Sequence, residues 1–193
     1  MIKERKADAT EAVGEAAFYG PKLDFMAYDS LGRQWQVATI QADRNMPERF
    51  DLYCVNEKGE HERIVMIHAA IMGSIERFVS VLIEHTAGKF SLWLSPEQVR
   101  VLTIADRFND YAESVRRKLS DKDIRVTCDF RAETLNKKIR EAELAKVNYI
   151  LVVGEKEMNN KTINVRTRDN EIIGEKNVDE FLQQLLKEVE EKK

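Results

Sequence analysis

The first half of the chain alternates apolar and polar residues in short runs, the spacing expected of half-buried strands. Turn-forming residues at 29–33 and 57–60 separate these runs in pairs and predict two β-hairpins, with Pro47 and Arg49 marking a loop between them. The expected strands are residues 23–28, 35–41, 50–56 and 63–68.

The spacing becomes helical after Gly73. The apolar residues on one predicted helix face are Ile75, Phe78, Val79, Leu82 and Ile83. Gly88 suits the C-cap of this helix, because glycine adopts the left-handed conformation without strain. The apolar run at residues 64–67, just ahead of the Gly73 turn, reads as a buried strand, and residues 89–96 read as a linker.

The second half alternates strand and helix patterns. Strands are expected at residues 98–104, 124–130, 149–153, 162–168 and 171–174, and helices at residues 109–120, 134–146 and 178–193. The strongly apolar strand at 149–153 belongs in the middle of a sheet. This alternation predicts an α/β unit with a mainly parallel sheet covered by helices and one antiparallel edge.

Composition and charge narrow the class of protein. The 193 residues are 43% hydrophobic and carry a net charge of −3, which argues against a general polyanion binder. Cys54 and Cys128 lie far apart in strand-like runs without a CxxC partner, so we expect reduced, partly buried thiols rather than a metal site. No signal peptide or membrane-spanning run is visible, and we therefore expect a soluble, cytoplasmic protein with no membrane partner.

The run of residues 73–78 places Arg77 one turn into a helix, after a Gly73-Ser74 turn. A guanidinium at that position can hold phosphate oxygens in pairs or stack on an aromatic base. Taken alone, the run is a weak signal, since an arginine near a helix start is more often a solvated surface residue.

Further blocks accompany this run, in fixed order, at residues 17–25, 32–41, 47–52, 65–68 and 93–99. Together the blocks resemble the carboxy-terminal part of the threonyl-tRNA synthetases, a family of class II aminoacyl-tRNA synthetases. The charged, alanine-rich residues 1–14 are expected to be a leader or the remnant of a longer chain. The resemblance implies a partial class II catalytic core with motif 3 at residues 15–92 and an anticodon-binding domain at residues 97–193. The first part is then α+β, built on an antiparallel sheet, and the second is a mixed-sheet α/β domain. Trp93 and Pro96 mark the expected boundary.

The resemblance also assigns roles to single residues. Arg77 matches the motif 3 arginine that packs on adenine and reaches the ATP phosphates, and with Lys22 it is the candidate catalytic residue. The residues that match the ATP and threonyl-adenylate pocket are Tyr19, Lys22, Gln36, Thr39, Gln41, Ser74 and Arg77. On spacing alone, Gln36 and Gln41 would be ordinary strand residues, and Lys22 a surface lysine. Ala69 and Arg44 depart from the family pattern.

His68 matches one of three ligands of the zinc ion that the family uses to select threonine. From the sequence alone, a single histidine at the end of an apolar strand is more often structural. The other two ligands are expected upstream of Met1 in a full-length enzyme. We therefore expect ATP and zinc to be cofactors of the full-length family, with neither bound usefully by this chain alone.

The second part offers candidate RNA contacts. Glu157 and Arg166 match positions with which the family reads the anticodon of threonine tRNA, and a third such position holds Ala132. Both also have structural readings, Glu157 as a turn residue and Arg166 as an exposed strand residue. A basic helix face could follow phosphates or could simply be solvated; its members are Arg131, Lys137, Lys138, Arg140 and Lys146.

The parent reaction implied by the resemblance is ATP-dependent threonylation of tRNA, with threonine, ATP and threonine tRNA as partners. Class II motifs 1 and 2 are not found in this sequence, so we expect the chain alone not to form threonyl-adenylate. One alternative is a stand-alone tRNA-binding or partner-binding module derived from a synthetase, and another is an interaction domain that does not bind RNA. Unpaired strand edges in residues 15–92 further predict a homodimer.

Overall fold

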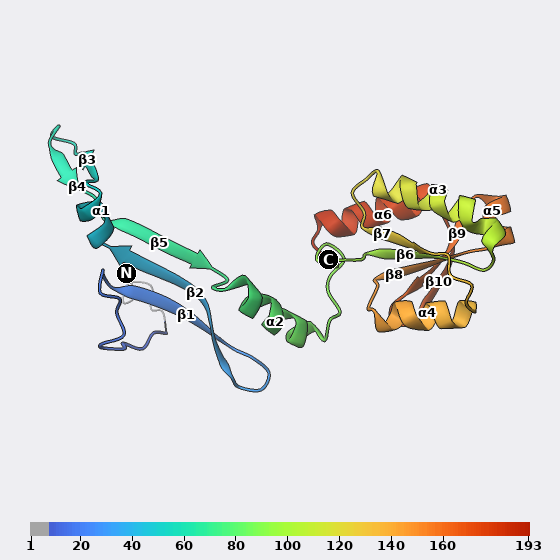
Figure 1. Ribbon diagram of the computed structural model, residues 1–193, viewed down its shortest axis with the longest axis horizontal. Helices are drawn as coiled ribbons and strands as arrows, with labels where there is room; N and C mark the ends of the chain where they lie inside the picture. The colour runs from blue at the N-terminus through green and yellow to red at the C-terminus, as the bar shows by residue number, and fades with distance from the viewer. Residues whose placement is uncertain (1–7) are drawn as a thin grey trace. The chain divides into compact units, whose positions relative to one another are not determined.

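The computed structural model describes residues 8–193, which form two compact units divided between His85 and Thr86 (Figure 1). Of the expected leader, residues 1–7 lie outside the described residues, and residues 8–14 form no helix or strand. None of the helices in residues 8–193 has the length and apolar character needed to cross a membrane.

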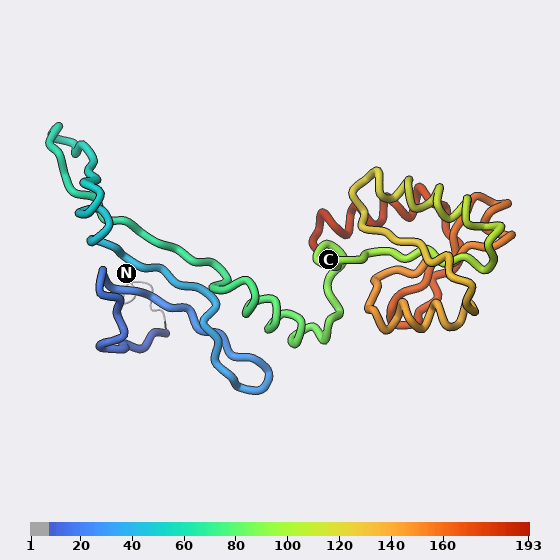
Figure 2. The backbone as a smooth tube through the Cα atoms, in the orientation of Figure 1, coloured from blue at the N-terminus to red at the C-terminus, as the bar shows by residue number. Residues whose placement is uncertain are grey.

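The first unit is built on a three-stranded antiparallel sheet with the order β1-β2-β5. Its strands are β1 (Lys22–Tyr28), β2 (Gln34–Asp43) and β5 (Met66–Ile71). The β1–β2 hairpin, drawn in blue in Figure 2, is the predicted one. Its turn is closed by Asp29, whose Oδ1 accepts the N–H groups of Leu31 and Arg33 at 2.9 Å.

The segment between β2 and β5 differs from expectation in two ways. The predicted loop is a short helix, α1 (Asn45–Arg49), because Asp43 Oδ1 accepts two backbone N–H groups at its start. The predicted strand at 63–68 is divided: β4 (His61–Arg63) pairs with β3 (Tyr53–Val55), whereas β5 pairs with β2.

The helix predicted after Gly73 is α2 (Ile75–Thr86), followed by Ala87 and Gly88 with φ of 52° and 73°. None of its residues is buried, and Ile75 is 72% exposed. The strand before it is not buried either, since Ile67 is 60% and Ile71 80% exposed. The expected buried strand therefore presents apolar side chains that nothing in the described chain covers.

The second unit contains a five-stranded sheet with the order β10-β9-β8-β6-β7. Its strands are β6 (Val99–Thr103), β7 (Val126–Asp129), β8 (Tyr149–Val153), β9 (Thr162–Thr167) and β10 (Ile172–Asn177). β7, β6 and β8 run parallel, whereas β9 and β10 add antiparallel strands at one side. This mixed sheet with β8 at its centre confirms the predicted fold class.

Helices cover both faces of this sheet (Figure 1). They are a 3-10 turn (Asp106–Phe108), α3 (Asn109–Ser120), α4 (Leu135–Leu144), α5 (Glu155–Asn160) and α6 (Val178–Glu190). α3 and α6 pack on one face around Phe181, which is 0% exposed. α4 packs on the other face through Ile139 and Ala142, while Leu144, at the end of α4, is 66% exposed.

The two cysteines are free thiols. Cys54 lies exposed in β3, which corrects the expectation of partial burial. Cys128 is half-buried in β7, where burial raises its pKa to about 12 and keeps it protonated near neutral pH. No group of three metal-ligating side chains occurs among residues 8–193.

The stretch expected to be a linker is tied to the second unit. Arg125 donates to the carbonyls of residues 92, 93 and 95, and Gln98 Nε2 donates to the carbonyl of residue 92 at 2.8 Å. Asn148 and Arg168 both donate to the carbonyl of residue 90. Leu92, at 2% exposed, belongs to the core of the unit. Residues 90–95 are therefore a strap on the second unit rather than a free connection.

Candidate functional site

Asp24 organises three of the predicted pocket residues on one face of the first sheet. Its Oδ2 accepts from Lys22 Nζ at 2.6 Å, and its Oδ1 accepts from Gln36 Nε2 at 2.9 Å and from Thr39 Oγ1 at 2.7 Å. Asp24 lies directly opposite Thr39 in the β1–β2 ladder. The hydrogen bond from Lys22 holds the pKa of Asp24 below its ordinary value, so the carboxylate stays ionised. Sequence reasoning missed Asp24, although alternate strand residues such as Lys22 and Asp24 share a face.

A second cluster of polar side chains, Tyr19, Gln41, His68 and Asp43, lies further along β2. Tyr19 donates from its hydroxyl to Gln41 Oε1 at 2.5 Å, and Gln41 lies opposite His68 of β5. The rings of Tyr19 and His68 meet edge to face at 6.2 Å. His68 Nε2 lies 2.8 Å from Oδ2 of Asp43, which is 2% exposed. The pKa of Asp43 is below its ordinary value, mainly because its carboxylate accepts the backbone N–H of Met46. This buried carboxylate orients His68 through the contact at Nε2.

Arg77 and Ser74 lie at the start of α2, beside a hollow of about 180 Å³. Arg77, Gln36 and Trp35 are among the residues that line it. The Arg77 guanidinium forms no hydrogen bond or ion pair with the described residues, whereas Ser74 Oγ donates to Glu76 Oε2 at 2.6 Å. The φ of Gly73 is 61°, and a Cβ there would lie 3.2 Å from the Gln36 carbonyl oxygen, so glycine brings α2 close to β2. Gln36 thereby belongs to both the Asp24 cluster and the hollow.

Glu157 lies at the carboxyl end of β8, in the first turn of α5. It is 9% exposed, and its Oε2 accepts the backbone N–H of Gly154 at 3.0 Å. Ile104 packs against Gly154 so closely that a Cβ at residue 154 would lie 2.1 Å from Ile104 Cδ1. One carboxylate oxygen of Glu157 is therefore used to cap α5, which leaves the other for a partner.

Arg166 lies in β9, directly opposite Ile150 of β8. Ile150 packs with α4, so the Arg166 side chain is on the α4 side of the sheet. The residue is half-buried, and its guanidinium makes no hydrogen bond or ion pair within residues 8–193. Other arginines of this unit are engaged with carboxylates or carbonyls, namely Arg100, Arg116, Arg117, Arg125, Arg131 and Arg168. The donors of Arg166 are therefore not used by another side chain or carbonyl within residues 8–193.

The structure does not bring Glu157 and Arg166 into contact. Ile150, opposite Arg166, precedes Gly154 by four residues, which corresponds to about 13 Å along a strand. Ala132 is exposed in the loop between β7 and α4.

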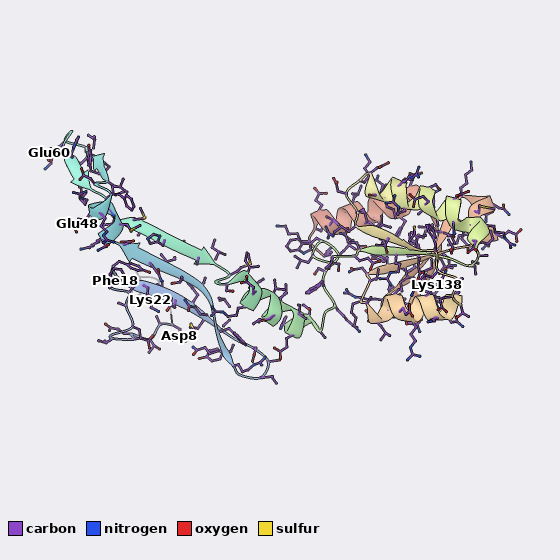
Figure 3. All side chains as sticks on the ribbon, viewed as in Figure 1. Asp8, Phe18, Lys22, Glu48, Glu60 and Lys138 are labelled. Atoms are coloured by element: carbon purple, nitrogen blue, oxygen red, sulfur yellow. The ribbon has the colours of Figure 1, made fainter. Side chains whose placement is uncertain are left out.

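Of the two readings of the basic helix face, a row of cations that follows phosphates or an ordinary helix surface, most of its members do not support the first. Arg131 forms a fork on Asp129 and also bonds Glu141. Lys137 Nζ bonds Glu133, and Lys138 is 3% exposed between α4 and the sheet (Figure 3). Two of these cations are neutralised by carboxylates, and a third is inside the unit. They do not form a row of free charges that could follow phosphates.

Glu175 of β10 lies opposite Asn164 of β9 and is held by three side chains of its own unit. It accepts from Asn160 Nδ2 at 3.0 Å, Thr162 Oγ1 at 2.7 Å and Lys156 Nζ at 2.5 Å. These bonds, with Asn160 the largest contribution, lower its pKa to about 2. The charge of Glu175 is thereby matched within the chain.

We expect Glu175→Gln to lower the melting temperature slightly at pH 7 and to have a clearly smaller effect at pH 2. The folded pKa lies below the unfolded value of about 4.3, so the ionised carboxylate stabilises the fold above that value. This contribution is lost as the pH falls through the folded pKa of about 2. Thermal unfolding followed by circular dichroism between pH 7 and pH 2 measures it. Glu171→Gln, at an exposed turn residue, is the control, and a wild-type-to-variant difference independent of pH would contradict the prediction.

Comparison with known proteins gives two family matches. Residues 2–86 match the tRNA synthetase class II core domain (G, H, P, S and T), and residues 98–188 match the anticodon binding domain. The chain is 52% identical over 190 residues to a threonine–tRNA ligase of Azobacteroides pseudotrichonymphae and 53% identical over 177 residues to that of Clostridioides difficile. These alignments cover 98% and 92% of the chain but only 29% and 28% of the relatives.

A solved structure is similar over most of the chain. The RNA-binding domain of threonyl-tRNA synthetase from Cryptosporidium parvum matches with a TM-score of 0.81 and 43% identity. The match covers 90% of this chain and 44% of that protein.

Proposed function

Because the chain belongs to the threonyl-tRNA synthetase family, whose C-terminal region it matches, we propose that its second unit binds the anticodon of threonine tRNA. The observation that carries this proposal is Arg166, a half-buried guanidinium with no partner in a unit that matches the anticodon binding domain. Anticodon bases are single-stranded and can turn their edges toward a sheet. The two parallel N–H groups of Arg166 suit the O6 and N7 atoms of guanine, and the free oxygen of Glu157 suits a base amino group.

The first unit contributes part of a site for ATP and threonine in the same proposal. Arg77 has a free guanidinium beside an apolar hollow, which suits a phosphate and an adenine ring. The Asp24 cluster fixes Lys22, Gln36 and Thr39 on one face, and Tyr19 and Gln41 continue it. The complete reaction, ATP-dependent threonylation of tRNA in the cytoplasm, belongs to a protein of the length of the relatives, of which this chain spans about 29%.

The residues present do not make a complete zinc site. His68 Nε2 faces Asp43 Oδ2 at 2.8 Å, and residues 8–193 contain no group of three side chains that could hold a metal ion. No step is assigned to zinc on this chain. The apolar side chains of Ile67, Ile71 and Ile75 are consistent with a cover from a longer protein or from a second copy in a homodimer.

Fluorescence anisotropy tests the RNA-binding proposal. A labelled synthetic stem–loop with a threonine anticodon is titrated with the 193-residue chain, beside a stem–loop of the same stem and a different anticodon. Tighter binding of the threonine loop supports the proposal, and equal binding of the two loops contradicts it. A parallel assay of threonine-dependent pyrophosphate exchange is expected to show no activity for this chain alone; exchange would refute the assignment of catalysis to the longer protein.

A further inference from the structure

The face of β9 that carries Arg166 also carries Asn164. Residues two apart in a strand point to the same side and lie about 7 Å apart. The residues between and beside them, Ile163 and Val165, are 0% exposed on the opposite face, in the core with α3 and α6. Asn164 is therefore on the α4 side of the sheet, next to Arg166 and half-buried as Arg166 is.

The Asn164 side chain makes no hydrogen bond within the described chain, although an amide can make up to four. Its neighbour in β8 is Val152, which offers no polar atom, and its neighbour in β10 is Glu175. The carboxylate of Glu175 is already occupied by Asn160, Thr162 and Lys156. A partly buried amide between an apolar side chain and a satisfied carboxylate lacks a partner inside the chain, which points to one outside it.

The sheet register places Asn164 between the two predicted anticodon contacts. Arg166 is opposite Ile150 and Asn164 opposite Val152. Gly154, two residues beyond Val152, directly follows β8, and its N–H is bonded to Glu157. Ile150, Val152 and Gly154, which mark the places of Arg166, Asn164 and Glu157, thus follow one another in steps of two residues, about 7 Å each.

We propose that Asn164 is a specificity-determining residue that contacts the edge of the anticodon base next to the one bound by Arg166. The inference rests on the proposed function of this unit. The carboxamide presents a donor and an acceptor side by side, and this pair matches the donor and acceptor pair on a base edge. A free guanidinium and a free amide on neighbouring positions of one strand allow two successive bases to be read.

The experiment compares Asn164→Ala and Asn164→Asp with wild type, using the whole chain. The probes are a synthetic stem–loop with a threonine anticodon and three stem–loops that each differ from it at one anticodon position. Asn160→Ala is the matched control, because the Asn160 amide is exposed and bonded to Glu175. Thermal unfolding verifies that each variant is folded.

We expect Asn164→Ala to bind the threonine loop about tenfold more weakly than wild type. The variant should also stop distinguishing a substitution at one position next to the base that Arg166 contacts. Asn164→Asp keeps the shape but loses the donor and adds a negative charge, so its loss should be at least as large. Asn160→Ala should stay within about twofold of wild type.

Two results overturn the inference, and they differ from each other. If wild type prefers the threonine loop and folded Asn164→Ala binds all four loops as wild type does, Asn164 reads no base, although the proposed function stands. If wild type itself binds all loops equally, the proposed function fails, and the inference fails with it.

Discussion

Replacing Arg166 with alanine is expected to lower the affinity for a threonine anticodon stem–loop by about 10- to 100-fold, which corresponds to one bidentate contact between arginine and a base. Arg166 is half-buried, and its guanidinium has no partner among residues 8–193 that it would have to release in order to bind guanine. Its loss removes two directed hydrogen bonds and not only a charge. Anisotropy titrations at low and high salt measure the effect, and the loss should persist at high salt, where phosphate attraction is screened.

Arg140→Ala is the matched control for this prediction. Arg140 is an exposed residue of α4, and its replacement changes the net charge by the same amount. We expect a change smaller than threefold that disappears at high salt. If Arg166→Ala and Arg140→Ala weaken binding equally, then Arg166 acts as one more surface charge and reads no base.

Replacing Lys138 with methionine is expected to destabilise the second unit by about 3 kcal/mol. Lys138 is 3% exposed, and its Nζ donates to the carbonyls of Thr103 and Asp129 at 3.1 Å. These carbonyls lie at the ends of β6 and β7. Methionine keeps most of the packing volume but donates no hydrogen bond, so two buried acceptors lose their partner. The melting temperature of the unit should fall by roughly 15 °C, measured by calorimetry on the whole chain.

Lys137→Met provides the comparison one residue away. Lys137 is an exposed partner of Glu133, and surface pairs contribute less than about 1 kcal/mol. A melting temperature close to wild type is expected. If the two variants have the same melting temperature, the Lys138 side chain contributes nothing to the stability of the unit, and the two carbonyls find other donors when it is removed.

The local pattern of apolar and polar residues predicts most helices and strands of the second unit. β8 and α3 have the predicted bounds, because continuous apolar residues and helical periodicity, respectively, span those elements without interruption. α5 was missed, since six residues carry little periodic signal. In α4 the buried face follows Leu135, Lys138, Ile139 and Ala142 rather than Leu144. The acceptors that allow a lysine there come from strands 35 and 9 residues away, which no local pattern reveals.

The candidate site was predicted in its residue types but not in its connections. The resemblance pointed to Lys22, Gln36 and Thr39, and the structure shows that one carboxylate, Asp24, holds all three. Strand alternation would have placed Asp24 with Lys22. The division of the strand expected at 63–68 could not be predicted, because β5 pairs with β2, some 25 residues earlier in the chain, and pairing is a tertiary choice.

The strap at residues 90–95 sets the smallest version of the second unit that can be cut out intact. A chain begun at Glu97 would lack Leu92, and the core would be open where that side chain sits. Arg125 and Gln98 would also lose the carbonyls they hold at residues 92–95. Anyone grafting this module onto another protein should therefore join the new sequence ahead of Lys89, at the left-handed Ala87–Gly88 pair.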